Sequence, residues 1–108
     1  MQATQFKQKK KRMYTVETTK IFDDWLRSLK DMRVKATIIT RLERAENGNL
    51  GDHKTVGKGV SEMRIDIGKG YRLYYTIRGN TIIFMLTGGD KSTQQTDIKQ
   101  AQSMKETL

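Results

Sequence analysis

A chain of 108 residues with 35% hydrophobic content is long enough for one folded domain with its own core. The chain has no cysteine and a single histidine, which excludes a disulfide framework, a thiol nucleophile and a Cys- or His-rich metal site, so we expect no metal and no cofactor. No apolar run approaches the roughly 20 residues that span a membrane, and the basic N-terminus lacks the apolar segment of a signal peptide, so we expect a cytoplasmic location without membrane contact.

The formal net charge of +9 is concentrated in two stretches of the chain. Residues 1–12 carry five bases and no acid, which predicts a disordered tail, or an arm that touches nucleic acid, before a single domain over residues 13–108. Residues 54–91 carry seven bases and three acids, and the rest of the chain is neutral. Because this basic stretch also contains tyrosines, it predicts a surface for a polyanion, with RNA as the first candidate.

Two helices are expected after a short edge strand at residues 13–17. Thr19 can cap the first helix and Asp31 the second, and Asn47-Gly48 ends the second. Apolar residues recur at the helical spacing in both segments: Phe22, Trp25, Leu26 and Leu29, then Val34, Ile38, Leu42 and Ala45. The short connection predicts an antiparallel helical hairpin with these stripes in the core.

The second half of the chain reads as strands followed by a helix. Residues 49–60 are rich in glycine and predict a loop, whereas residues 61–67, 71–77 and 81–87 predict three strands. Ser92 or Thr93 can cap a short final helix. The expected fold class is therefore α+β, with an N-terminal helical hairpin packed on a small antiparallel sheet with a mixed edge, and a short C-terminal helix.

The glycine turns allow the strand register to be predicted. Gly79-Asn80 suits a two-residue type II′ loop, which pairs Tyr75 with Phe84 on the face that the helical hairpin covers. The turn at residues 68–70 suits three loop residues, which pairs Asp66 with Arg72. This register leaves one face uncovered, and that face is expected to carry Glu62, Arg64, Asp66, Arg72, Tyr74 and Thr76.

Arg64, Arg72 and Lys91 are the candidate catalytic cations. On one open face they could bind phosphate and stabilise the negative charge of a phosphoryl-transfer transition state. The alternative is a solvated basic face in which Asp66 neutralises Arg72. Tyr74 could stack an RNA base there, or could simply pack against a neighbouring strand.

Two carboxylates are candidates for the general base of such a reaction. Asp90 follows two glycines and is assigned to the catalytic set, although the same position suits a turn or a helix cap. Glu62 is the alternative base. The single histidine, His53, lies in the predicted loop and is more often incidental in such a position.

Three segments carry a resemblance to a known family: Glu62-Met63-Arg64-Ile65, Gly68-Lys69-Gly70-Tyr71-Arg72-Leu73-Tyr74-Tyr75 and Gly88-Gly89-Asp90-Lys91-Ser92-Thr93-Gln94. Together with the preceding helical hairpin, their order and spacing over residues 13–106 resemble the RelE/ParE superfamily of bacterial toxins. The resemblance is closest to the HigB-like group of addiction module killer proteins.

The resemblance implies a RelE-like fold, a cognate antitoxin as partner, and cleavage of mRNA in the ribosome without metal, by attack of the 2′-OH on the adjacent phosphate. Arg72 matches the arginine of the family's Tyr-Arg motif, while Arg64 and Lys91 match basic residues on the preceding strand and after the central strand. Lys54 is a looser match and, with Lys69 and Tyr74, is expected to bind RNA.

The sequence departs from the RelE pattern near its end, because no tyrosine follows Tyr75. The identity of the base therefore stays open at this point. Two other functions are compatible with the same resemblance: a ParE-like inhibitor of DNA gyrase, and a nontoxic RNA-binding relative.

Overall fold

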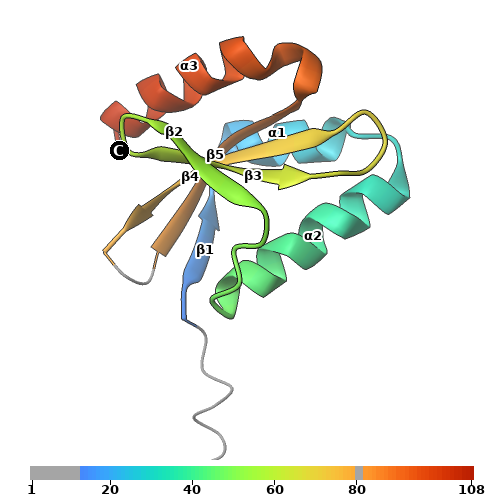
Figure 1. Cartoon of the computed structure of the whole chain (residues 1–108), viewed down its shortest axis with the longest axis horizontal. Coiled ribbons are helices and arrows are strands. Elements are labelled where there is room, and N and C mark those ends of the chain that lie inside the picture. Colours follow the sequence, from blue (N-terminus) through green and yellow to red (C-terminus); the bar gives the residue numbers. More distant parts are fainter. Residues whose placement is uncertain (1–12, 80–81) are drawn as a thin grey trace, which may run out of the picture.

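The computed structural model describes residues 13–79 and 82–108, so the predicted tail lies outside the described residues. The elements in chain order are β1 (Thr15–Thr18), α1 (Lys20–Ser28), α2 (Met32–Glu46), β2 (His53–Gly57), β3 (Val60–Ile65), β4 (Tyr71–Arg78), β5 (Ile82–Asp90), the short 3-10 helix η2 (Lys91–Thr93) and α3 (Gln94–Glu106). The predicted α+β class is confirmed, including the helical hairpin and the C-terminal helix (Figure 1).

The five strands form one sheet in the order β1-β5-β4-β3-β2. β1 pairs parallel with β5 and all other pairs are antiparallel, which confirms the predicted mixed edge. β2 lies where a loop was predicted. Four of its five residues are exposed, so this edge strand shows none of the apolar alternation by which a strand is recognised.

The two caps predicted for the helical hairpin are present, whereas Thr93, at the N-cap position of α3, makes no side-chain capping bond. The Thr19 hydroxyl accepts a hydrogen bond from the Phe22 amide at 3.0 Å, and the Asp31 carboxylate accepts one from the Arg33 amide at 2.9 Å. The Thr19 hydroxyl also donates to the Leu86 carbonyl at 2.7 Å. The start of α1 is therefore fixed to β5 as well as capped.

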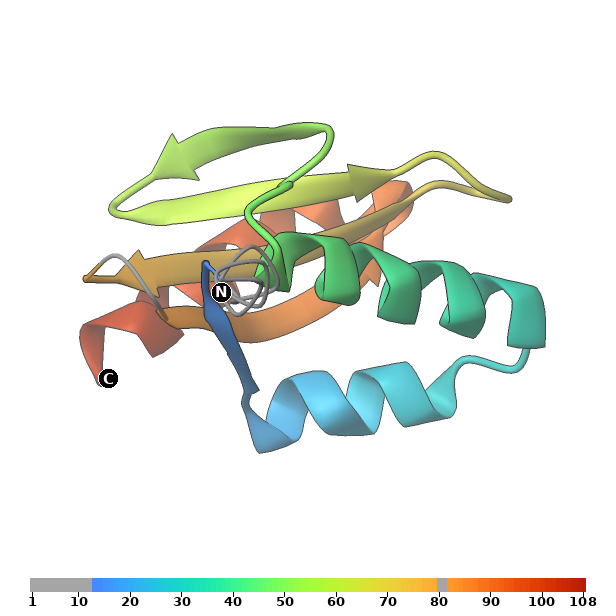
Figure 2. The same cartoon turned by 90° about the horizontal axis from the view of Figure 1, so that it is seen from below.

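The sheet has a hydrophobic core on each side. The helical hairpin covers a core that includes Phe22, Ile38, Leu73 and Tyr75, and α3 covers a second core of Val60, Tyr74, Leu86 and Ala101 (Figure 2). The prediction of an uncovered face is therefore wrong. The apolar stripe of α3 is short, but its few apolar residues pack directly on the strands.

The predicted register between β4 and β5 is also wrong. Three residues, 79–81, separate the paired positions Arg78 and Ile82, and Tyr75 lies opposite Met85 instead of Phe84. A bulge after Tyr74 then shifts the pairing again. As a result Met85 enters the hairpin core, while Phe84 and Leu86 pack beneath α3.

Between β3 and β4 the turn is longer than predicted. Arg64 lies directly opposite Arg72, and the predicted pair of Asp66 with Arg72 does not form. The observed register therefore differs from the predicted register by two residues. Because side chains alternate with a period of two, an even shift keeps Arg64 and Arg72 on one face.

Gly88 and Gly89 occupy positions in β5 where no side chain fits. A Cβ atom on Gly88 would collide with the indole ring of Trp25, and one on Gly89 would collide with the carboxylate of Asp97. The two glycines thus allow α1 and α3 to approach the same strand from opposite sides.

A candidate phosphate-binding site

The three predicted catalytic cations lie together at the end of the sheet. Arg64 and Arg72 line one hollow with Lys91, and its volume is about 320 Å³. The Lys91 amide donates to the Gly70 carbonyl at 3.1 Å, and its side chain lies so close to Gly70 that a Cβ there would be 2.7 Å from Lys91 Cδ. Asp52 and Asp66 complete the lining.

Arg64 is oriented by neighbours on two sides. Its Nη2 lies 2.9 Å from Asp52 Oδ1, and the hydrogen bond from this guanidinium lowers the pKa of the Asp52 carboxyl. Arg41 of α2 donates from Nη1 to the Arg64 carbonyl at 2.6 Å. The Arg64 side chain remains 36% exposed, so it is positioned and still accessible to a ligand.

Arg72 is more deeply placed and faces a buried carboxylate. Its side chain is 13% exposed, and its Nε lies 3.7 Å from Oε2 of Glu62, which is fully buried. The other Glu62 oxygen accepts a hydrogen bond from Gln94 of α3 at 3.0 Å. The alternative assignment of Glu62 as general base is wrong, because no substrate hydroxyl can reach a buried carboxylate.

Tyr74 does not present its ring to solvent. Its side chain is fully buried in the core beneath α3, so the prediction that it stacks an RNA base is wrong. Burial also raises the pKa of its hydroxyl well above the ordinary value, so this group stays protonated. Tyr74 is therefore a packing residue, although it packs beneath α3 and not against Met85 of the neighbouring strand, which lies in the core beneath the helical hairpin.

Asp90 caps the short helix η2 and lies outside the cationic hollow. Its Oδ1 accepts from the Ser92 amide at 2.8 Å, and its Oδ2 lies 3.4 Å from Lys69 Nζ. The hydrogen bond from the Ser92 hydroxyl lowers the pKa of the Asp90 carboxyl, which makes it a weaker base. The structure therefore does not bring Asp90 and Lys69 into the hollow with the three cations.

Two further charged residues lie in or beside the hollow, Asp66 and Lys54. Lys54 lies on β2 opposite Glu62 and is exposed, beside the hollow but not in its lining. Asp66 lines the hollow and is exposed, and in the described part of the chain it makes no ion pair. Sequence reasoning missed Asp66 as a candidate base, although its place just after Arg64 was a usable signal.

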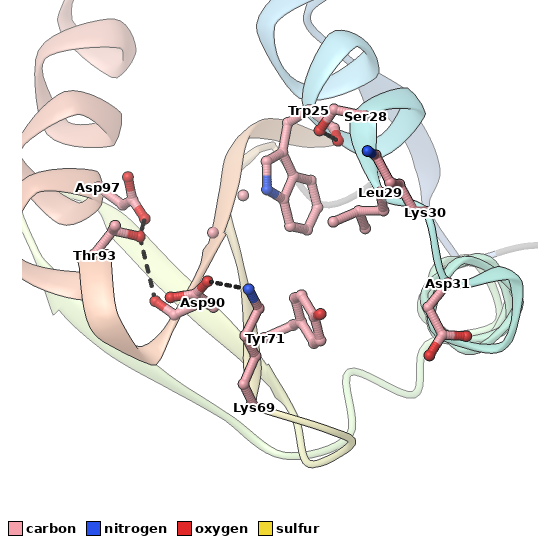
Figure 3. A pocket seen from close by; sticks show the side chains of 12 residues that line it. Trp25, Ser28, Leu29, Lys30, Asp31, Lys69, Tyr71, Asp90, Thr93 and Asp97 are labelled. Atoms are coloured by element: carbon pink, nitrogen blue, oxygen red, sulfur yellow. Dashed lines mark hydrogen bonds and ion pairs between the residues drawn. The ribbon is translucent and has the colours of Figure 1, made fainter.

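A second hollow, of about 590 Å³, lies between the end of α1, the turn from β3 to β4, and the start of α3 (Figure 3). Its lining includes Trp25, Tyr71, Asp90, Asp97 and Lys69. Apart from the paired glycines in β5, no feature of the sequence indicated this hollow. Trp25, predicted as core, is partly buried and packs against the hairpin core while also lining this hollow.

No helix among the described residues is long and apolar enough to cross a membrane. The same residues contain no group of three or more His, Cys, Asp or Glu side chains placed to hold a metal ion.

Fold and site thus define an α+β protein with a cationic hollow at the end of its sheet. Residues 24–108 match the family described as "Phage derived protein Gp49-like (DUF891)", and the chain belongs to that family. It is a family of toxin–antitoxin toxins related to the RelE-like toxins. The chain is also 47% identical over 93 residues to an uncharacterized protein of Haemophilus influenzae, which covers 86% of this chain and 94% of the relative.

Proposed function

We propose that this chain is the toxin of a type II toxin–antitoxin module and that it acts as an endoribonuclease on mRNA. The family supports the toxin class. The observation that supports RNA cleavage is the direct pairing of Arg64 with Arg72 in one hollow with Lys91. Two guanidinium groups and an ammonium around a small hollow suit the oxygens of a single phosphodiester.

The reaction proposed for this hollow needs no group outside the chain. The 2′-oxygen of the substrate forms a bond to the adjacent phosphorus and loses its proton to Asp66, while the bond from phosphorus to the 5′-oxygen breaks. The 5′-oxygen leaves with a proton from Lys91, which gives a 2′,3′-cyclic phosphate and a 5′-hydroxyl end. Arg64 and Arg72 stabilise the charge that builds on the non-bridging oxygens.

The proposed partners follow from the same electrostatics. The positive hollow attracts mRNA, which we expect to be presented by the ribosome, and an acidic segment of a cognate antitoxin could cover it. Both partners would compete for Arg64 and Lys91, the more accessible cations of the site.

The test is induced expression in bacteria, with primer extension to map the ends of mRNA. Arg64→Ala and Lys91→Ala should each abolish cut ends and restore growth. Arg72→Lys should do the same while keeping a charge beside Glu62, because lysine cannot form the two-pronged contact of arginine. Arg27→Ala is the matched control, since Arg27 lies on the exposed side of α1, with its side chain 73% exposed.

Growth arrest with intact mRNA and continued translation would overturn the nuclease proposal. If that arrest came with DNA damage and filamentation, the gyrase-inhibitor alternative would replace it. Full toxicity of the Arg64 and Lys91 variants would show that the assigned hollow is not the site.

A further inference from the structure

The larger hollow adjoins the candidate phosphate site along one short stretch of chain. Gly70, Arg72 and Lys91 line the cationic hollow, whereas Lys69, Tyr71 and Asp90 line the larger one. These residues alternate in sequence at the paired ends of β4 and β5. Tyr71 and Arg72 are neighbours on β4 and therefore point to opposite faces of the sheet, so the two hollows lie on either side of this strand end. A nucleic acid strand that occupies both hollows must pass around the strand end.

The larger hollow offers an aromatic surface. The ring centroids of Trp25 and Tyr71 are 6.5 Å apart, and the planes are tilted by 56°. Gly88 lies against the indole, so the floor beside the rings is backbone without a side chain. A flat ring that enters this space meets aromatic faces, and stacking on an aromatic side chain is favourable for any base.

The hollow is lined by three carboxylates, those of Asp31, Asp90 and Asp97, and by the ammonium groups of Lys30 and Lys69. Asp97 Oδ2 accepts from the Thr93 hydroxyl at 2.6 Å, while its Oδ1 makes no hydrogen bond to any described residue. The Asp90 carboxylate lies in the same wall, with Lys69 beside it (Figure 3). The free Oδ1 of Asp97 favours a ligand that donates a hydrogen bond, such as the exocyclic amine of cytosine.

We propose that the hollow between Trp25, Tyr71 and Asp97 binds a nucleobase that carries an exocyclic amine, next to the phosphate held by Arg64, Arg72 and Lys91. The inference rests on the proposed ribonuclease function and adds a base subsite to it. Uracil presents a carbonyl where cytosine presents an amine, so Asp97 discriminates against it. Lys69 and Lys30 in the same lining disfavour a cationic side chain as the occupant.

The single tryptophan of the chain provides a direct probe, since fluorescence of Trp25 reports on this hollow alone. The purified protein is titrated with CMP, UMP and ribose 5-phosphate, with correction for nucleotide absorbance. CMP should quench Trp25 and bind at least about fivefold more tightly than UMP, the factor that corresponds to one well-made base contact. Ribose 5-phosphate should leave the emission unchanged.

Asp97→Asn should remove the preference of CMP over UMP without loss of fold, which circular dichroism checks. Glu106→Gln is the matched control, because it neutralises a carboxylate of the same helix, α3, outside the lining of the hollow. Equal affinities for CMP and UMP in the unaltered protein would overturn the proposal. Quenching by arginine amide, with none by CMP, would also overturn it and assign the hollow to a protein partner.

A second titration separates this inference from the proposed function. A fluorescein-labelled RNA with a 2′-O-methyl group at each position cannot be cleaved by the proposed reaction, and its binding is followed by anisotropy. If the RNA binds in a salt-sensitive way that depends on Arg64, and CMP does not change the fluorescence of Trp25, the base subsite is refuted. The ribonuclease proposal is then unaffected. CMP quenching of Trp25 together with intact mRNA after induced expression would refute the ribonuclease proposal and retain a base site.

Discussion

Loss of Arg72 alone should destabilise the protein far more than loss of the pair that it forms with Glu62. Glu62 is fully buried, and the guanidinium 3.7 Å away is the cation facing its second oxygen. Arg72→Met leaves a buried carboxylate without its counter-charge, which typically costs 3–5 kcal/mol, or about a third of the stability of a small domain. With a urea m-value of about 2 kcal/mol/M, the unfolding midpoint should fall by about 2 M.

The double variant Glu62→Gln/Arg72→Met tests whether the unpaired charge of Glu62 causes the loss of stability. Glutamine keeps an acceptor for the Gln94 amide at the position of Oε1 and removes the charge. We therefore expect the double variant to recover at least half of the lost stability, or about 2 kcal/mol. Arg64→Met is the control and should cost less than about 1 kcal/mol, because its ion pair with Asp52 is exposed.

Urea unfolding followed by circular dichroism measures all four proteins. A loss below about 1 kcal/mol for Arg72→Met would refute the reasoning, since it would show that the carboxylate is stable without its partner. Failure of the double variant to recover stability would assign the loss to packing of the Arg72 side chain instead of its charge.

Three further outcomes test the architecture. Gly88→Ala should lower stability by about 1–3 kcal/mol in thermal unfolding, because its methyl group collides with Trp25, and an unchanged melting temperature would contradict that contact. Thr19→Ala removes both the α1 cap and the bond to Leu86, so it should cost about 1–2 kcal/mol in urea, and a neutral effect would contradict the capping role. Arg64 lowers the pKa of Asp52, so the stability from this pair is present above the ordinary pKa of 3.8 and is lost as the pH falls through the lowered value. Arg64→Ala should return the pKa of Asp52 towards 3.8 in an NMR titration, and an unmoved titration would contradict the pair.

The helices could be predicted from the sequence because their signals are local. Thr19 and Asp31 mark helix starts within a few residues, and the Asn47-Gly48 stop is equally short-range. The strand register could not be predicted, since the bulge after Tyr74 depends on which side chains pack on each face. β2 (His53–Gly57) was not predicted, because an exposed edge strand has no apolar pattern.

Part of the candidate site could also be predicted, because the face on which a strand residue lies follows from local alternation along the chain. The prediction that Arg64 and Arg72 share a face required only the right parity of the strand register. The register error of two residues preserved that parity. The role assigned to Tyr74 required knowledge of what covers the sheet. The three apolar positions on α3, Ile98, Ala101 and Met104, were too few to indicate that this helix closes over the face.

The position of α3 explains why the accessible charge lies at the end of the sheet. On the covered part of this face Glu62 and Tyr74 are both fully buried, and the Glu62 carboxylate faces the guanidinium of Arg72, so neither Glu62 nor Tyr74 can contact a substrate. Past the start of α3 the cover ends, and there Arg64 and Lys91 reach solvent with Asp66 beside them. A ligand must therefore approach along the strand ends, which is the one route that meets both hollows. A partner that covers this end of the sheet would block phosphate and base together without touching the core.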